Sequence, residues 1–215
     1  MRSIPLDQIH EAARAIETGG LVIVPTRRWY MICADATNEA ACRSIFHAKQ
    51  RPLTKSLVLV SPSADHCERH FVVHHEARKL MEAFWPGDLA LLLPWRDEQT
   101  SAQYTAVGAP ALVTRSSDAL GRLAEAAAVP VAATTVNVSG DAHADAPGPS
   151  ITVDEVQAFL KLTDVPVSVV LDGGVCPAGD HLAIVDCSTP EARLVRAGLV
   201  HQRALSAALG RELVG

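Results

Sequence analysis

KQRPLTKSLVLV, residues 49–60, is a basic corner that leads into an apolar strand. Pro52 prevents a preceding helix from continuing and biases Arg51 toward an extended backbone. Arg51 can offer a planar fork to two phosphate oxygens, while Lys49 and Lys55 act as flexible point charges. The stretch therefore indicates a polyphosphate-binding corner. The alternative is an ordinary solvated helix end, whose cations favour the helix dipole.

Outward from this corner, apolar runs alternate with segments of helical periodicity. The expected strands are 21–24, 30–34, 56–60, 89–94, 110–115, 130–135, 167–171, 182–186 and 193–196. The expected helices lie at 8–18, 38–48, twice within 63–84, and at 117–128, 152–162 and 201–213, with a loop at 97–102. Several strands are apolar throughout, which is typical of a sheet covered on both faces. We therefore predict one α/β domain.

Composition limits the classes of function. The chain has 215 residues, of which 48% are hydrophobic and 20% charged, with a net charge of −5. A core of useful size is expected, and nucleic-acid binding would need a local basic patch. No apolar run is long enough to span a bilayer, and residues 1–7 lack the apolar stretch of a secretory signal. We expect a cytoplasmic protein that has no membrane partner.

Cysteines and histidines raise the question of a metal site. The five cysteines form no Cys-x-x-Cys pair, which favours reduced thiols in a cytosolic protein. Cys67, His70 and His74 would share one face if their segment were a single helix. Residues 71–73 read as extended, however, and no partner pair follows at a recognisable spacing. We therefore expect no metal site in the protein.

Four segments, taken in order, resemble the YrdC/Sua5 family. They are Pro25-Thr26, the K-x-R-P motif at 49–52 with Lys55, Trp85-Pro86-Gly87, and the stretch TTVNVSG at 134–140. The resemblance covers residues 6–200 and leaves 201–215 as a C-terminal helix packed on the domain, so the chain looks like the short form of the family. It implies a single-domain twisted mixed sheet with flanking helices and a large basic cleft, a fold that also suits double-stranded RNA.

For the nucleotide, the resemblance implies a set of contacts in three segments. The K-x-R-P motif, on Lys49 and Arg51, holds the ATP phosphates and carries the catalysis, and Lys55 assists it. The family's S-x-N-x-S-G motif falls on residues 135–140, where Thr135 and Asn137 keep a hydroxyl and an amide. An ordinary turn that satisfies its own backbone is the alternative reading of that pair. Near the C-terminus, Arg196 matches a further nucleotide contact.

For the amino-acid substrate, the resemblance implies contacts from Thr26, Tyr30 and Arg115. Arg115 ends an apolar run, and an arginine there could clamp the carboxylate of threonine or the carbamoyl group made from it.

The threonine-site motif departs from the family pattern. Where the family reads P-T-[ED]-T-x-Y-G-L, this chain places Arg27 and Arg28 at the acidic residue and second threonine, and Met31 at the glycine. In the family's S-T-[VI]-V-D, two hydroxyls are replaced by Leu182 and Ala183. Each lost hydroxyl that bonded a buried ligand oxygen costs about 1–3 kcal/mol of binding unless another group compensates.

The implied function is that of a threonylcarbamoyl-AMP synthase, a nucleotidyltransferase. It would convert L-threonine, bicarbonate and ATP, with Mg²⁺, into threonylcarbamoyl-adenylate and pyrophosphate for the modification of adenosine 37 of tRNA. Two alternatives remain open. A divergent paralogue could use a related small acid or another acyl or carbamoyl-type substrate, as the added cations suggest. A non-catalytic module could bind tRNA or double-stranded RNA.

Overall fold

A single mixed sheet organises the computed structural model, which describes residues 2–50, 52, 55–138, 148–177 and 179–215. Within this part of the chain, ten strands follow the spatial order β1-β8-β2-β3-β7-β4-β6-β5-β9-β10. The strands are β1 (Arg2–Pro5), β2 (Leu21–Pro25), β3 (Tyr30–Asp35), β4 (Val58–Val60), β5 (Leu89–Leu93), β6 (Ala111–Thr114), β7 (Val131–Thr135), β8 (Val167–Asp172), β9 (Ala183–Asp186) and β10 (Arg193–Arg196). Parallel pairs such as β2–β8 and β4–β6 occur beside antiparallel pairs such as β2–β3 and β3–β7.

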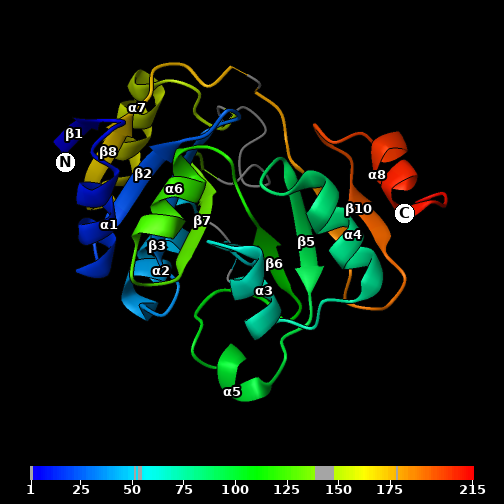
Figure 1. Cartoon of the computed structure of the whole chain (residues 1–215). Helices are drawn as coiled ribbons and strands as arrows, with labels where there is room; N and C mark the ends of the chain where they lie inside the picture. The colour runs from blue at the N-terminus through cyan, green and yellow to red at the C-terminus, as the bar shows by residue number, and fades with distance from the viewer. Residues whose placement is uncertain (1, 51, 53–54, 139–147, 178) are drawn as a thin grey trace.

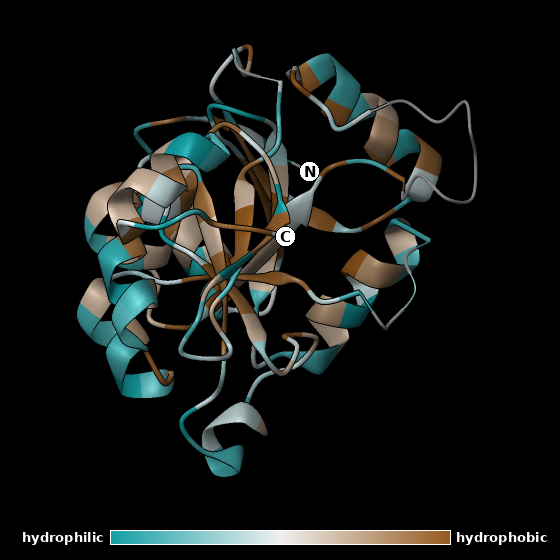
Figure 2. Ribbon diagram, turned by 90° about the vertical axis from the view of Figure 1, so that its right-hand side faces the viewer, coloured by the Kyte–Doolittle hydropathy of each residue, from teal (hydrophilic) through white to brown (hydrophobic). Residues whose placement is uncertain are grey.

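Helices cover both faces of this sheet (Figure 1). They are α1 (Ile9–Glu17), α2 (Glu39–Ala48), α3 (Ala64–His70), α4 (His75–Phe84), α5 (Glu98–Ser101), α6 (Ala119–Ala126), α7 (Val153–Thr163) and α8 (Gln202–Leu209). The apolar sides of α1 and α6 enclose one core cluster, and α2, α3, α4, α7 and α8 contribute to the other. Figure 2 shows the hydrophobic strands running between these helices.

β2 illustrates why the sheet is sandwiched. All five of its residues are buried. Leu21 and Ile23 belong to one core cluster and Val22 and Val24 to the other, because successive side chains of a strand point to opposite faces. A continuous apolar run is therefore what this position requires, and the predicted α/β domain with helices on both faces is confirmed.

Most predicted boundaries lie within two residues of the structure, but three parts of the chain differ from the prediction by more. The N-terminal residues form β1, an edge strand that pairs in parallel with β8 and was not predicted. The expected loop at 97–102 contains the short helix α5, where Asp97 accepts a 2.6 Å hydrogen bond from the Thr100 amide. The last helix ends at Leu209 rather than near 213, because Gly210 adopts a left-handed conformation with φ of 72° and terminates it.

The helix predicted at 152–162 is confirmed as α7, and a capping box opens it. The Thr152 hydroxyl accepts from the Glu155 amide, and the Glu155 carboxylate accepts from the Thr152 amide. At the C-terminal end, α8 packs on α4, and Leu205, Leu209 and Leu213 are buried. The ends of the described chain lie at opposite sides of the sheet (Figure 1).

Candidate active site

A small cavity of about 160 Å³ gathers residues from distant parts of the sequence. Of the predicted site residues, five line it: Arg28, Met31, Thr135, Leu182 and Arg196. The remaining lining is Trp29, Ser56, Val58, Leu112, Thr134, His181 and Ile184. The cavity thus lies where the β2–β3 turn, the end of β7 and the strands β9 and β10 approach one another.

The β2–β3 turn is shaped by Thr26. Its backbone amide donates to the Trp29 carbonyl at 2.9 Å, and its hydroxyl donates to the same carbonyl at 2.8 Å. The hydroxyl also accepts from the amides of Arg28 and Trp29, at 3.1 and 3.0 Å. Short hydroxyl side chains fold turns in this way. Thr26 therefore positions its neighbours here, and its predicted contact with substrate remains a prediction.

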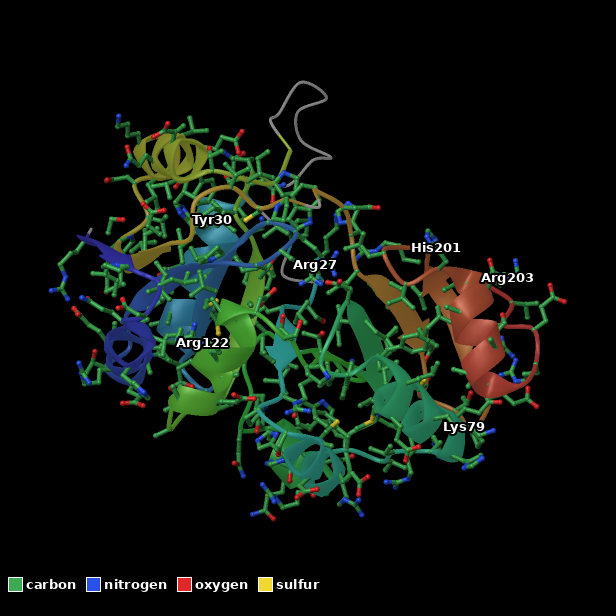
Figure 3. The ribbon with its side chains drawn as sticks, turned by 45° about the horizontal axis from the view of Figure 1, so that its top comes forward. Arg27, Tyr30, Lys79, Arg122, His201 and Arg203 are labelled. Atoms are coloured by element: carbon green, nitrogen blue, oxygen red, sulfur yellow. The ribbon has the colours of Figure 1, made fainter. Side chains whose placement is uncertain are left out.

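The two arginines of this turn lie in different environments. Arg28 is 2% exposed and donates from Nη1 to Asp88 Oδ1 at 2.9 Å. Arg27 is 58% exposed at its side chain, pairs with Asp88 Oδ2 at 3.2 Å, and does not line the cavity (Figure 3 labels it). Burial lowers the pKa of Arg28, an effect opposed mainly by the charge of Asp88. The turn thus sends one cation inward and keeps the other at the surface.

Lys49 lies at the end of α2 and is only 1% exposed. Its ammonium donates to the Thr135 carbonyl at 2.6 Å, to the Asn137 carbonyl at 2.7 Å and to Asn137 Oδ1 at 2.8 Å. An ammonium has three donor hydrogens, so these three oxygens match its full capacity. In this structure Lys49 ties the basic corner to the end of β7, and its predicted phosphate contact would require one of these bonds to open.

The hydroxyl-amide pair predicted to face the nucleotide forms a local network. Thr135 Oγ1 donates to Asn137 Oδ1 at 2.7 Å, and Asn137 Nδ2 donates to the Val138 carbonyl at 2.9 Å. Thr135 lines the small cavity, whereas Asn137 lines a neighbouring, mainly apolar cavity of about 420 Å³. Trp29 lines both cavities.

The opposite wall comes from β9 and β10. Arg196 donates from Nη2 to the Leu182 carbonyl at 3.0 Å, which fixes it beside the segment where the family carries hydroxyls. Leu182 lines the cavity, but Ala183 is fully buried and does not. His181 also lines the cavity, and partial burial together with the charge of Arg196 lowers its pKa.

Arg115 and Tyr30 lie outside this cavity's lining. Arg115 Nη2 is 3.7 Å from Glu125 Oε1, and its Nε is buried without a hydrogen-bond partner among the described residues. Tyr30 is fully buried; its hydroxyl donates to the Gly174 carbonyl at 2.8 Å and accepts from the Gly173 amide at 3.2 Å. Desolvation raises the pKa of Tyr30. Both substrate assignments remain predictions.

Two further members of the nucleotide set can be placed only in part. Arg51 lies outside the described residues, as do positions 139 and 140 of the second motif. Lys55 is exposed.

Sequence reasoning missed Asp88, Trp29 and His181. Asp88 directly follows the Trp-Pro-Gly motif, and an acid beside a predicted turn was the available signal. Asp88 forms ion pairs with both arginines of the β2–β3 turn. Trp29 and His181 pack as tilted rings with centroids 5.7 Å apart. Neither Trp29 nor His181 belongs to a sequence motif that would have predicted a role in the site.

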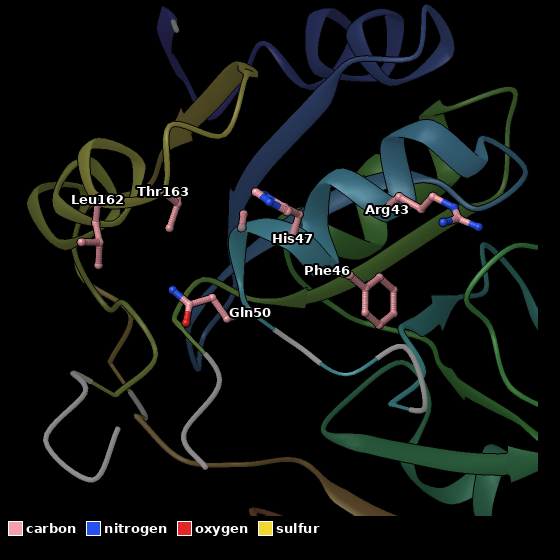
Figure 4. Close-up of a pocket in the computed structure, with 7 residues that line it drawn as sticks. Arg43, Phe46, His47, Gln50, Leu162 and Thr163 are labelled. Carbon is pink, nitrogen blue, oxygen red and sulfur yellow. The ribbon is translucent and has the colours of Figure 1, made fainter. Parts of the chain in front are cut away.

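A larger hollow of about 750 Å³ lies between α2 and α7 (Figure 4). Its lining, which includes Phe46, His47, Gln50 and Leu162, contains none of the predicted site residues. Its cation, Arg43, pairs with Glu39 one helical turn away. Size alone therefore does not locate the site, and convergence of the motifs favours the smaller cavity.

Magnesium was expected together with ATP. Among the described residues, no carboxylate lines the small cavity and no group of three or more His, Cys, Asp or Glu could hold a metal. Magnesium therefore stays a prediction, as an ion that the phosphates of ATP would bring with them. Among the described residues, no helix is both long and apolar enough to cross a membrane.

Comparison with known proteins gives a consistent result. The sequence model of the Sua5/YciO/YrdC family, described as "Telomere recombination", matches residues 14–198. Threonylcarbamoyl-AMP synthase of Bacillus subtilis is 28% identical over 207 residues, which cover 94% of this chain and 57% of that protein. The protein of the same name from Pyrococcus abyssi is 28% identical over 192 residues, with 89% and 54% covered. The crystal structure of P. abyssi Sua5 complexed with L-threonine superposes with a TM-score of 0.83 at 26% identity, covering 100% of this chain and 61% of that one. The chain thus spans little more than half the length of these relatives.

Proposed function

The chain belongs to the Sua5/YciO/YrdC family, and from this premise we propose that it is a nucleotidyltransferase of the threonylcarbamoyl-AMP synthase type. The substrates are L-threonine, bicarbonate and ATP. The amino group of threonine attacks the carbon of bicarbonate, the C–OH bond breaks, and water leaves to give a carbamate. A carbamate oxygen then attacks the α-phosphate of ATP. Pyrophosphate leaves, and threonylcarbamoyl-adenylate is the product.

One observation carries the proposal. Residues from four separate motifs line a single cavity: Thr135 and Arg196 match the family pattern, and Arg28, Met31 and Leu182 lie where this chain departs from it. The cavity brings two guanidinium groups, Arg28 and Arg196, to one space, and it shares Trp29 with a neighbouring apolar cavity. A charged space beside an apolar one suits substrates that combine anionic groups with a purine base.

For this reaction, the protein mainly has to position the substrates and supply positive charge. Adenylate transfer places negative charge on the α-phosphate and on the departing pyrophosphate, which fixed positive groups stabilise. Arg196 and Lys55 are the described candidates for that role, with Arg51 outside the described residues. Lys49 would act by holding the turn at 135–137 in place.

Pyrophosphate release tests the proposal directly. Purified protein with MgATP and bicarbonate should release pyrophosphate when L-threonine is added, and mass spectrometry should detect the threonylcarbamoyl-adenylate. Omitting bicarbonate is the matched control and should abolish release. No threonine-dependent release, together with no thermal shift on adding ATP, would contradict the proposal.

A divergent paralogue is the second candidate, because Arg28 places an added cation in the cavity. Such a protein would prefer an acidic amino acid or a phosphorylated compound over threonine. A substrate panel separates the two: threonine should give the highest kcat/KM under our proposal, and an acidic substrate should under the alternative.

The product's acceptor is the final part of the proposal. We expect the adenylate to supply adenosine 37 of tRNA, so a complete modification system should incorporate labelled threonine into tRNA only when this protein is present. A module that only binds RNA would show salt-dependent RNA affinity and no pyrophosphate release.

A further inference from the structure

Arg28 presents an unoccupied hydrogen-bonding edge. Its guanidinium makes one hydrogen bond to the described residues, from Nη1 to Asp88. Nε and Nη2 form the other edge of the planar fork. Neither of these nitrogen atoms is among the fully buried polar atoms that lack a hydrogen-bond partner. The side chain is only 2% exposed and lines the small cavity, so the small surface that it exposes is assigned to that cavity. A buried cation with a free fork is what bidentate carboxylate recognition requires.

The charge balance around the cavity favours an anion. Arg196 is the second guanidinium of the lining, and no acidic residue among those described belongs to it. Asp88 offsets part of the positive charge, but Arg27 shares that carboxylate at 3.2 Å. The charges of Asp118 and Asp180 also act on Arg28 and Arg196, respectively, from outside the lining. Among the described residues, the two guanidinium groups are thus the charged groups of Asp, Glu, Lys and Arg that line the cavity itself.

The cavity's size restricts the ligand that can meet this edge. Its volume of about 160 Å³ corresponds to about five water molecules at ~30 Å³ each. This space accommodates an end of amino-acid size rather than a whole nucleotide. The proposed reaction supplies two anionic groups of suitable size, bicarbonate and the α-carboxylate of the amino acid, and of these only the α-carboxylate stays chemically unchanged throughout the reaction.

Two other features favour Arg28 as the group that holds the carboxylate. Arg115, the residue that the family resemblance assigns to this task, does not line the cavity and lies near Glu125. Leu182, which replaces a family hydroxyl, lines the same cavity as Arg28. Arg28 therefore brings new hydrogen-bond donors to the same cavity in which position 182 has lost a hydroxyl.

We propose that the Nε–Nη2 edge of Arg28 binds the α-carboxylate of the amino-acid substrate, while Nη1 stays on Asp88. The inference rests on the proposed function and adds to it a specificity-determining residue from the altered part of the motif. Threonine's own carboxylate takes no part in the adenylation, so it is free to be held throughout the reaction.

The test compares L-threonine with L-threoninamide, which keeps the amino group but lacks the carboxylate. KM values for both, and for ATP, are measured by pyrophosphate release in wild type, Arg28→Met and Arg28→Lys. Arg27→Met is the matched control, because Arg27 shares Asp88 but does not line the cavity. Calorimetric titration with each amino acid gives binding independently of turnover, and thermal melts show that every variant is folded.

In wild type, threonine should bind roughly 10- to 100-fold more tightly than threoninamide, the range expected for charge-assisted hydrogen bonds. Arg28→Met should remove this preference by weakening threonine alone, with KM for ATP unchanged. Arg28→Lys should fall between them, because it keeps the charge but loses the fork, and Arg27→Met should match wild type.

An unchanged preference in folded Arg28→Met would overturn the inference while leaving the proposed function intact. A rise in KM for ATP instead of threonine would also overturn it and assign the edge to phosphate. If wild type binds threonine through Arg28 but releases no pyrophosphate, the proposed function fails and the inference stands. If wild type binds no threonine, both fail.

Discussion

Replacing Lys49 by methionine should destabilise the fold, because it removes the hydrogen bonds that the Lys49 ammonium makes to Thr135 and Asn137. Methionine keeps a flexible, unbranched side chain of similar length, so the stem's packing changes little. The ammonium's three bonds, at 2.6, 2.7 and 2.8 Å, are lost, and the two backbone carbonyls of Thr135 and Asn137 lose this donor. Asn137 Oδ1 still accepts from the Thr135 hydroxyl.

The magnitude follows from these contacts. A buried acceptor left without its donor costs about 1–3 kcal/mol, and two carbonyls are affected. Removing an ammonium that folding must desolvate offsets part of this loss. We therefore expect the free energy of unfolding to fall by about 2–4 kcal/mol. For a chain of this length, each kcal/mol lowers Tm by about 2–4 °C, so Tm should fall by roughly 5–15 °C.

Urea denaturation followed by circular dichroism measures the change, with Lys55→Met as the matched control. Lys55 is an exposed lysine of the same basic corner, so its removal should alter the unfolding free energy by at most about 0.5 kcal/mol. If Lys49→Met is as stable as Lys55→Met, the three short contacts do not organise the turn at 135–137, and the reasoning is refuted.

Three further predictions use other parts of the structure. Asp118→Ala should lower the unfolding free energy by about 1–2 kcal/mol, because Asp118 caps α6 and accepts from the Arg27 amide; a change below about 0.3 kcal/mol would contradict this. Hydrogen bonding to Arg211 lowers the pKa of Glu76, so this carboxylate stabilises the fold above its ordinary pKa and stops doing so as pH falls through the lower folded value. Glu76→Gln should therefore be less stable than wild type at neutral pH and equally stable in acid below that range, and a pH-independent difference in urea denaturation would count against the ion pair. Burial raises the pKa of all five cysteine thiols, so Ellman's reagent should label none of them rapidly at pH 8 and all of them in denaturant.

The sequence predicted the central strands well because their burial leaves a clear trace. A strand enclosed on both faces, such as β2, must be apolar at every position, and that pattern is rare elsewhere. β1 was missed for the converse reason. It is a four-residue edge strand with one buried residue, Ile4, so little in its own composition distinguishes it from a loop. Its pairing with β8 depends on a residue separation that no local pattern reveals.

The sequence predicted which types of residue form the site, but it did not predict which residues they would contact. Arg27 and Arg28 are adjacent and chemically identical, so no sequence pattern could tell which one enters the cavity. The bonds of Thr26 set the turn, and Asp88, sixty residues away, pairs with the buried guanidinium. Lys49 was recognised as a cation of the corner, but its binding to the end of β7 depends on the packing of α2 against the sheet.

The two buried cations of this region differ in what they can still offer a ligand. Lys49 has three donor hydrogens and three protein oxygens around it, so a ligand must displace a protein contact to reach it. Arg28 needs only Nη1 for Asp88 and keeps a whole edge of its fork for the cavity. The motif shared with the family therefore holds the site's shape, while the altered motif carries a free donor edge. Replacement of the family's threonine by Arg28 is thus better explained as an exchange of one ligand contact for another than as the loss of a site.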